Sequence, residues 1–351
     1  MDSSNLQNFK THQYCGAIHI HSVFSDGTGN VDSISRAAKA AGLDWIIITD
    51  HNSLEIEEGI FNDVYVIKGE EISPKNNHYL ALGINEVICP DEAPTNYVNK
   101  VRELGGFGFA AHPDEGANNC RKNKWAPIFW EDKNIIPDGI EIWNWFSGWA
   151  DNLNDESILS IAYSFFNKHK TIPDPYRETL NWWDELNRES KKTIPAIGGI
   201  DAHALKIYDY LIPLTIFPYK TCFKTINNVI TLKEPLSGTF YVAKEQILNE
   251  LKNGNNIIIN RNLHREIPQI YFSTPDKNIF FGETVALCNG TCLNIKADIT
   301  MNLKLVHNGN TILDTDTCKC KIPVTEAGNY RVELYYKNRG YVFTNPIRVI
   351  T

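Results

Sequence analysis

Short apolar runs alternate with helix-like stretches from the start of the chain to about residue 260, and this alternation restricts the fold most. Repeated strand and helix units build a parallel sheet, because parallel neighbours need a crossover connection between them. We therefore expect an α/β fold with a barrel-like parallel arrangement. The expected strands are 17–21, 45–49, 64–67, 79–83, 107–111, 139–142, 194–200 and 211–216. The expected helices are 31–41, 96–104, a long insertion at about 152–192, and 244–253.

The sequence changes character after about residue 267. Alternating runs such as LNIKADI and YRVELYY lack helical periodicity and are separated by the turn signals NG, HNGN and EAGN. The chain of 351 residues is long enough for two domains. We therefore expect a first domain over 1–265 and a small all-β sandwich over 266–351.

Composition narrows the classes of partner and compartment. The chain is 42% hydrophobic and 22% charged, as in ordinary globular proteins, and its net charge of −8 disfavours stable binding to nucleic acid. The first residues contain no run typical of a signal peptide, and no apolar stretch approaches the roughly 20 residues of a membrane span. We expect a cytoplasmic protein that acts on a small molecule without a membrane; the sequence does not indicate an oligomeric state.

Four of the eight cysteines cluster near the C-terminal end. Cys288, Cys292, Cys318 and Cys320 form a CxxxC and a CxC, and both spacings differ from the paired CxxC pattern of zinc sites. Free thiols or a local disulfide are favoured, and zinc stays the alternative.

Histidines and carboxylates recur where expected strands end. His19 and His21 lie two apart at the end of the first strand, so both side chains should point to the same side. Six of the ten histidines share such a position, whereas a single histidine of this kind is more often a hydrogen-bonded core residue. Mixed imidazole and carboxylate groups suit zinc, manganese or iron(II) better than calcium or magnesium. The other candidates of this pattern are Asp50, His51, Glu70, Glu71, His78, His112, Asp201 and His203.

The motifs that carry these residues resemble a known family. GAIHIHSVFSDGT, TDHN, GEEIS, NHYLALG, AAHPDEG, GIEIWN and GGIDAHA, in this order, resemble the polymerase and histidinol phosphatase (PHP) superfamily of metal-dependent phosphoesterases. The GIEIWN block and the C-terminal β region resemble the branch that includes carbaryl and related carbamate or ester hydrolases. The resemblance implies a distorted (β/α)7 barrel followed by the sandwich.

The resemblance also implies a site for two or three divalent ions of zinc, manganese or iron. Glu71 is preferred over Glu70 as the bridging carboxylate, and Asp50 is expected to support the site without binding metal. The implied ligands are His19, His21, Asp201 and Glu71 for one ion, Glu71, His78 and His112 for a second, and Asp26, His51 and His203 for a third.

The implied reaction is hydrolysis by a hydroxide that bridges two ions, with Glu71, Asp201 and His203 as the catalytic residues. Three divalent ions bring six positive charges, and Asp26, Glu71, Asp201 and one hydroxide offset four of them, which favours an anionic phosphate. The leading hypothesis is a phosphoesterase that acts on a small phosphorylated molecule. Two alternatives stay open: a hydrolase of carboxylic or carbamic esters, and a metal-stabilised binding or regulatory module.

Residues on the substrate side are less constrained. Aromatic residues from Trp143 onward begin a tryptophan-rich insertion over about 143–192, and they either line the mouth of the site or, as we favour, pack the insertion. Basic residues that follow ligand motifs are candidates for phosphate contacts, although each one alone is more often a surface charge. These candidates are Trp145, Phe146 and Trp149 among the aromatic residues, and Arg121, Lys122, Lys124 and Lys206 among the basic ones.

Overall fold

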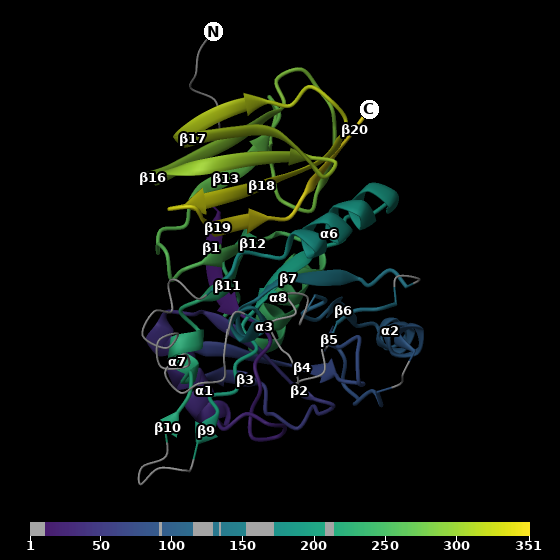
Figure 1. The fold of residues 1–351 in the computed structure, drawn as a ribbon, viewed down its shortest axis with the longest axis vertical. Coiled ribbons are helices and arrows are strands. Elements are labelled where there is room, and N and C mark those ends of the chain that lie inside the picture. The colour runs from purple at the N-terminus through teal and green to yellow at the C-terminus, as the bar shows by residue number, and fades with distance from the viewer. Residues whose placement is uncertain (1–10, 91–92, 115–128, 133–134, 152–171, 208–213) are drawn as a thin grey trace.

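The computed structural model describes residues 11–90, 93–114, 129–132, 135–151, 172–207 and 214–351. They form a mixed α/β fold with one large sheet and few helices (Figure 1). The strands of the first part are β1 His12–Ala17, β2 Trp45–His51, β3 Gly59–Phe61, β4 Val64–Ile72, β5 Tyr79–Leu82, β6 Phe107–Ala110, β7 Gly139–Asn144, β8 Ala196–Gly199, β9 Lys206–Ile207, β10 Leu214–Thr215, β11 Ile226–Leu232 and β12 Asn256–Asn260. The helices are α1 Val31–Ala41, α2 Pro94–Glu103, α3 Trp145–Asp151, α6 Arg177–Glu189, α7 Tyr219–Cys222 and α8 Phe240–Lys252.

Seven strands lie side by side in the order β1, β2, β4, β5, β6, β7, β8. All these pairings are parallel except those of β5, which returns directly from β4 and is antiparallel to both of its neighbours. Beyond the strands, Ile20 and Ala202 form an isolated parallel bridge, and the backbone N–H of Ile200 donates to the carbonyl of Ile18 at 3.1 Å. The first and last of these seven strands, β1 and β8, are therefore connected through the segments that follow them.

The expected alternation of strand and helix holds only in part. The described residues have α1 between β1 and β2 and α2 between β5 and β6, but from β2 to β5 strand follows strand without a helix. The mixed α/β class is confirmed, the regular alternation is wrong over β2–β5, and the (β/α)7 barrel stays a prediction.

Helix α1 occupies the range that its sequence predicts. Asn30 caps its start, since its side chain accepts from the N–H of Ser33 at 3.0 Å. Gly42 ends it in the left-handed region at φ 75°, where glycine has no Cβ to clash. The helix buries Ile34, Ala38 and Ala41 against the sheet. Local signals at both ends and a clear apolar face explain why this prediction is confirmed.

The first and the last expected barrel strands were misplaced. β1 lies at His12–Ala17 instead of 17–21, because His19 adopts a left-handed φ of 67° that interrupts a regular strand. In the range 211–216, residues 211–213 lie outside the described part of the chain, and Leu214–Thr215 pair antiparallel with β9 in a separate two-stranded sheet. Strands β11 and β12 were not expected; β11 pairs antiparallel with both β1 and β12.

The expected insertion at about 152–192 is described only in its second half. Residues 152–171 lie outside the described chain, and α6 Arg177–Glu189 follows them. Arg331 holds this helix to the C-terminal strands, since its buried guanidinium donates to both carboxylate oxygens of Asp184 at 2.7 Å. Glu333 accepts from the same guanidinium at 2.6 Å, so the buried charge of Arg331 is paired with two carboxylates.

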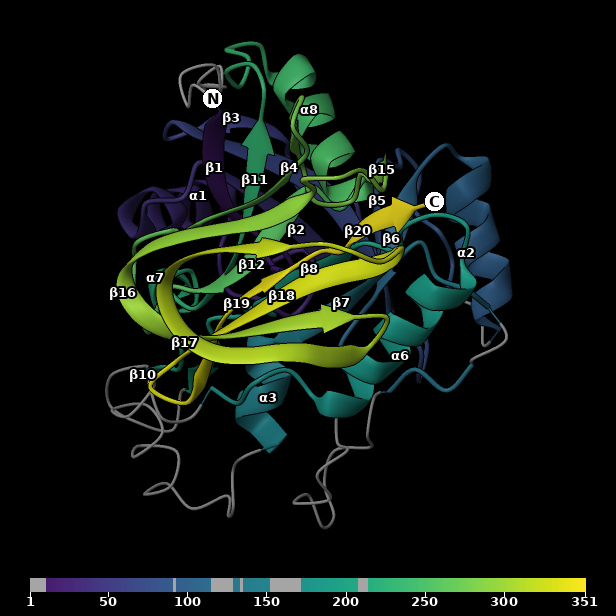
Figure 2. The same cartoon turned by 90° about the horizontal axis from the view of Figure 1, so that it is seen from above.

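The C-terminal part is built from strands alone. These are β13 Gln269–Ser273, β14 Asn278–Ile279, β15 Thr284–Ala286, β16 Cys292–His307, β17 Asn310–Pro323, β18 Gly328–Tyr336, β19 Arg339–Thr344 and β20 Ile347–Ile350. They form the yellow and green layer at the top of Figure 1, seen from above in Figure 2. β19 pairs antiparallel with β12, so the large sheet continues across residue 265. The all-β character agrees with expectation, whereas the sandwich and the domain boundary stay predictions.

The four clustered cysteines do not gather with other potential ligands among the described residues. Cys288, Cys292, Cys318 and Cys320 are free thiols, and the groups of potential metal ligands within the described chain contain no cysteine. The thiol interpretation is favoured over zinc.

The described helices include none that is both long and apolar enough to span a membrane.

Candidate metal centre

The structure brings all nine predicted ligands together. Some lie at strand ends: His51 is the last residue of β2 and Glu71 the next-to-last residue of β4. Others lie in the segments that follow β1, β6 and β8. The side chains form four overlapping groups whose potential ligand atoms lie within 4.8 Å of one another. These groups are His21, Asp26, His51 and His203; His19, His21 and Asp201; His19, Glu71 and His112; and His51, Glu71 and His78.

Four atoms converge at the centre of the cluster. Glu71 Oε2 lies 3.2 Å from His19 Nε2 and 3.3 Å from His21 Nε2, and Asp201 Oδ1 lies 3.5 and 3.1 Å from the same nitrogens. His19 Nε2, His21 Nε2 and Glu71 Oε2 are buried and make no hydrogen bond of acceptable geometry with any residue that the structure describes. Buried polar atoms without such a bond are costly, and imidazole nitrogens facing carboxylate oxygens match the donor set of a transition metal. The residues therefore fit a divalent cation here.

Glu71 also reaches a second set of nitrogens. Its Oε1 lies 2.8 Å from His78 Nδ1 and 3.2 Å from His112 Nε2, as expected for a bridging carboxylate. His51 Nδ1 lies 3.0 Å from Glu71 Oε2, a contact that the sequence did not predict.

Asp26 lies close to His51 and His203, the other two residues of the third implied ligand set. Its Oδ1 lies 3.2 Å from His203 Nε2, and its Oδ2 lies 3.7 Å from His51 Nε2. His21 Nδ1 is also 3.7 Å from Asp26 Oδ1. The three implied sets thus share residues, with His21 between the first and third and His51 between the second and third.

The two adjacent glutamates face different surroundings. Glu71 points into the histidine cluster, whereas Glu70 points away and accepts from the backbone N–H of Ile88 at 3.0 Å. Burial raises the pKa of Glu70 to about 7, and the hydrogen bond from Ile88 only partly opposes it. The geometry therefore agrees with the choice of Glu71 as the ligand.

Three candidate ligands have strained backbones. His19, His112 and Asp201 adopt φ values of 67°, 26° and 48°, in the left-handed region that residues other than glycine rarely enter. Such strain costs of order 1–3 kcal/mol per residue and is found preferentially at functional sites. This strain therefore destabilises the folded state, and the strained backbone orients the three side chains.

Charge couples the ionisable groups of the cluster. Burial would raise the pKa of Glu71, but His19, His51 and His78 hold it well below its usual range. Burial opposes the protonation of His203, yet Asp201 and Asp26 raise its pKa to about 9. Protons on these imidazoles occupy the positions that a cation would take, so metal binding should release protons.

Glu141 is a functional candidate that the sequence did not single out, although it lies in the GIEIWN motif. It is buried, and its Oε1 lies 2.8 Å from His19 Nδ1. Its Oε2 accepts from the backbone N–H of His112 at 2.6 Å and from the Asn144 amide at 3.0 Å. Glu141 thus contacts two candidate ligands, His19 and His112, and orients both.

Gly199 leaves the space that Glu141 needs. A Cβ at position 199 would lie 1.6 Å from Glu141 Oε1, so any larger residue would displace this carboxylate from His19. The GG pair in IPAIGGI is visible in the sequence. The need for glycine at position 199, however, comes from its contact with Glu141 on β7, which is distant in the chain.

Two further residues fix the loops around the cluster. Asp50 does not point at a histidine; it accepts from Ser22 N, Ser22 Oγ and Ser25 Oγ, each at 2.6 Å, in keeping with a supporting role. Tyr219, which the sequence did not indicate, has its hydroxyl 2.7 Å from the His21 carbonyl and 3.2 Å from that of His203. Burial raises the pKa of Tyr219 to about 12, so it stays a donor.

Glu141→Gln should weaken metal binding by about 10- to 100-fold, the usual effect of losing a carboxylate behind a ligand histidine. An amide offers one acceptor oxygen where Glu141 uses two, so either His19 or the N–H of His112 loses its partner. Metal titration against a competing chelator measures the change. The matched control is Glu245→Gln on the exposed face of α8. Equal affinities in both variants would contradict the role of Glu141.

The aromatic residues mainly pack the protein, as favoured from the sequence. Trp143, Trp145 and Trp149 are at most 8% exposed. Phe146 is the exception, since its ring centroid lies 5.6 Å from that of His203. Of the basic candidates, Lys206 is exposed on β9, and Arg121, Lys122 and Lys124 lie outside the described residues.

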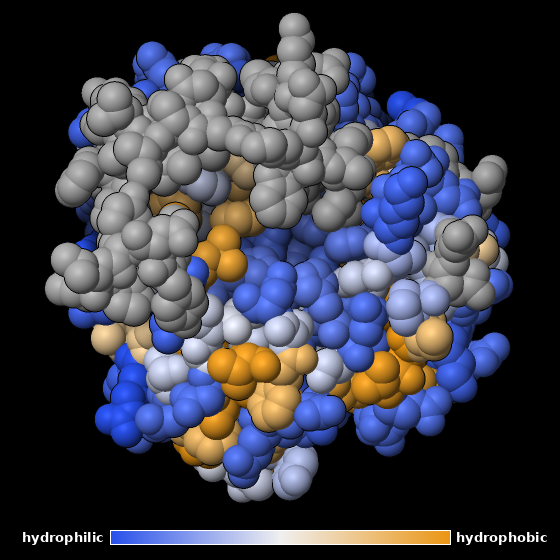
Figure 3. Space-filling view, turned by 60° about the horizontal axis from the view of Figure 1, so that its bottom comes forward, coloured by the Kyte–Doolittle hydropathy of each residue, from blue (hydrophilic) through white to orange (hydrophobic). Residues whose placement is uncertain are grey.

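The molecule is hollowed on one face. Figure 3 shows a depression lined by hydrophilic residues near the middle of the face that forms the bottom of Figure 1, where β9, β10 and α7 lie. β9 follows Asp201 and His203 closely along the chain.

The chain is similar to known proteins in sequence and in structure. Residues 17–128 match the family model of the PHP domain. An uncharacterized protein of Methanocaldococcus jannaschii is 30% identical over 147 residues, which cover 36% of this chain and 80% of that protein. A two-domain protein of Bacteroides vulgatus containing a predicted PHP-like metal-dependent phosphoesterase is 16% identical, with a TM-score of 0.46 over 96% of this chain and 95% of that one. The chain belongs to the PHP superfamily, and its PHP domain is matched over residues 17–128.

Proposed function

We propose that the protein is a metal-dependent phosphoesterase acting on a small phosphorylated molecule. The observation that carries the proposal is the buried convergence of His19 Nε2, His21 Nε2, Glu71 Oε2 and Asp201 Oδ1. Three of these atoms make no hydrogen bond of acceptable geometry within the described part of the chain. Such a set is costly without a cation and favourable with one. Membership of the PHP superfamily supports the same class of reaction.

The residues divide the tasks of this reaction. His19, His21, Glu71 and Asp201 would hold one divalent ion, and the sets around His78 with His112 and around Asp26 with His203 would hold the others. Bound zinc, manganese or iron would lower the pKa of a water and stabilise negative charge on the attacked group. Glu141 and Asp50 orient the ligands and the loop that carries Asp26. No serine or cysteine nucleophile is needed.

The charge of the cluster depends on how many ions bind. Glu141 lies against His19 and adds one negative charge to those of Asp26, Glu71, Asp201 and a hydroxide. Three divalent ions therefore leave an excess of one positive charge, whereas two ions leave an excess of one negative charge. An anionic substrate accordingly favours the three-ion form.

Metal removal tests the proposal directly. The purified protein should contain two or three zinc, manganese or iron ions per chain by elemental analysis. Chelation should abolish hydrolysis of 4-nitrophenyl phosphate, and added metal should restore it. Less than one ion per chain after growth with all three metals, or activity that survives chelation, would contradict the proposal.

One observation favours hydrolysis of a carboxylic or carbamic ester as the second candidate. The Phe146 ring is tilted against that of His203, with centroids 5.6 Å apart, and offers an apolar contact for an uncharged aryl group at the edge of the cluster. Rates of hydrolysis of a phosphate ester and of a matched carboxylic or carbamic ester would decide between the two candidate functions.

A further inference from the structure

A second cleft opens at the other end of the central strands. It has a volume of about 750 Å³ and is lined by the residues that precede β6, β7 and β8, among them Gly106, Asp138 and Pro195. The candidate metal ligands lie beyond the opposite ends of the same strands. The six residues of β7 span about 20 Å at 3.3 Å per residue, so a small molecule in the cleft would not reach the metal cluster.

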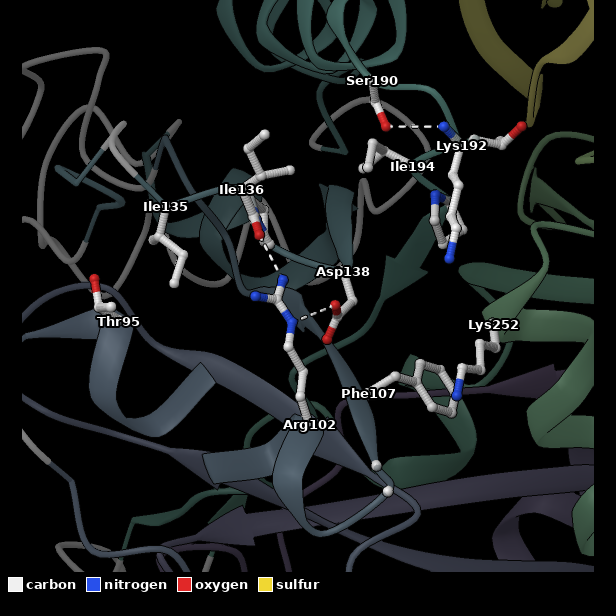
Figure 4. A pocket seen from close by; sticks show the side chains of 15 residues that line it. Thr95, Arg102, Phe107, Ile135, Ile136, Asp138, Ser190, Lys192, Ile194 and Lys252 are labelled. Atoms are coloured by element: carbon white, nitrogen blue, oxygen red, sulfur yellow. Dashed lines mark hydrogen bonds and ion pairs between the residues drawn. The ribbon is translucent and has the colours of Figure 1, made fainter. Parts of the chain in front are cut away.

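The cleft has an excess of positive charge. Arg102 and Asp138 neutralise each other, since Arg102 Nε donates to Asp138 Oδ1 at 2.8 Å. Lys192 and Lys252 also line the cleft, and neither has a carboxylate within 4 Å among the described residues. Figure 4 shows both lysine side chains extending toward the same space, across from the Arg102–Asp138 pair. Two uncompensated ammonium groups in a chain of net charge −8 form a local attraction for anions.

An apolar wall adjoins these charges. Phe107 lies beneath Lys252, whose Nζ is 5.4 Å from the ring centroid. Ile136 is 45% exposed in the cleft, and Pro137 continues the same wall. The volume lies within the roughly 300–1,000 Å³ typical of sites for small organic ligands.

We propose that this cleft binds a small organic anion, with its phosphate or carboxylate between Lys192 and Lys252 and its apolar part against Phe107 and Ile136. The position, one strand length from the metal cluster, makes it a separate site and not part of the substrate pocket. The proposal holds whether or not the metal cluster hydrolyses phosphate esters.

Calorimetric titration with phenylphosphonate, which carries both an anion and an aryl ring, tests the site. The variant Lys192→Glu with Lys252→Glu should weaken the binding by about tenfold or more, whereas Lys319→Glu with Lys321→Glu on exposed β17 should not. Both pairs are exposed, so folding should be unaffected, and Lys192→Gln with Lys252→Gln should lose part of the affinity. The metal cluster is intact in every variant, so the difference reports the cleft alone.

Further comparisons identify the ligand chemistry. Inorganic phosphate should bind the same site more weakly than phenylphosphonate because it lacks the apolar part, and benzyl alcohol should not bind because it lacks the charge. Binding should also weaken as ionic strength rises. Identical isotherms for the wild type and the Lys192→Glu, Lys252→Glu variant would overturn the proposal.

Discussion

Glu71→Gln is expected to abolish turnover, while Glu70→Gln, one residue away, leaves most of it. Glu71 places its two oxygens near His19, His21, His78 and His112, so the loss of its charge affects two ions at once. We expect kcat to fall by about 10³-fold or more, comparable to losing a group that stabilises the transition state directly. Metal content should fall below that of the wild type in elemental analysis.

Glu70→Gln is the matched control because the two residues share a motif and burial but not an environment. The pKa of Glu70, raised to about 7, means that this carboxyl is already partly neutral near physiological pH. A glutamine oxygen can still accept from the N–H of Ile88. If Glu70→Gln loses metal and Glu71→Gln does not, the choice of bridging ligand is wrong, although a metal-dependent reaction would survive.

The sequence predicted elements well where their signals are local. Asn30 and Gly42 bound α1 at the residues expected, and β2 and β4 begin at Trp45 and Val64 as predicted. It failed at β11, where Asn227 and Asn228 interrupt the apolar pattern. Asn228 is buried there because its amide pairs with the backbone of Gly198 on β8, a partner that no local pattern reveals.

Most ligands could be proposed from the sequence because they lie where an apolar run begins or ends, whereas Asp26 was implied by the family resemblance alone. The geometry of the ligands could not be predicted. His19 and His21 were expected on one strand face, yet they converge from an irregular segment in which His19 has a positive φ. Glu141 was missed because a carboxylate within a buried strand gives no sign of its partner, and His19 lies 122 positions away in the chain. Tyr219 was missed for the same reason, since its hydroxyl contacts the carbonyl of His21 across 198 positions.

Substrate preference is the second large effect that we expect. 4-Nitrophenyl phosphate should be hydrolysed with a kcat/KM at least about tenfold above that of 4-nitrophenyl acetate or the matched N-methylcarbamate, a difference of ~1.4 kcal/mol in transition-state stabilisation. The leaving group is the same in all three, so the ratio reports the group that is attacked. The physical reason is the excess positive charge of a three-ion cluster, which a phosphate dianion gains from and a neutral carbonyl does not.

Competition separates the phosphate preference from the aromatic contact. Inorganic phosphate should inhibit competitively, because it presents the same oxygens to the cluster without an aryl group. Phe146→Ala serves as the matched probe, since the ring lies against His203 but carries no ligand atom. For a phosphoesterase this change should raise KM with little effect on kcat, whereas an ester hydrolase that depends on the aryl contact should lose kcat/KM on the neutral substrates most. Faster turnover of the acetate or carbamate, together with no competition by phosphate, would replace the phosphoesterase with the ester hydrolase and would indicate a two-ion cluster whose negative excess no longer favours an anion.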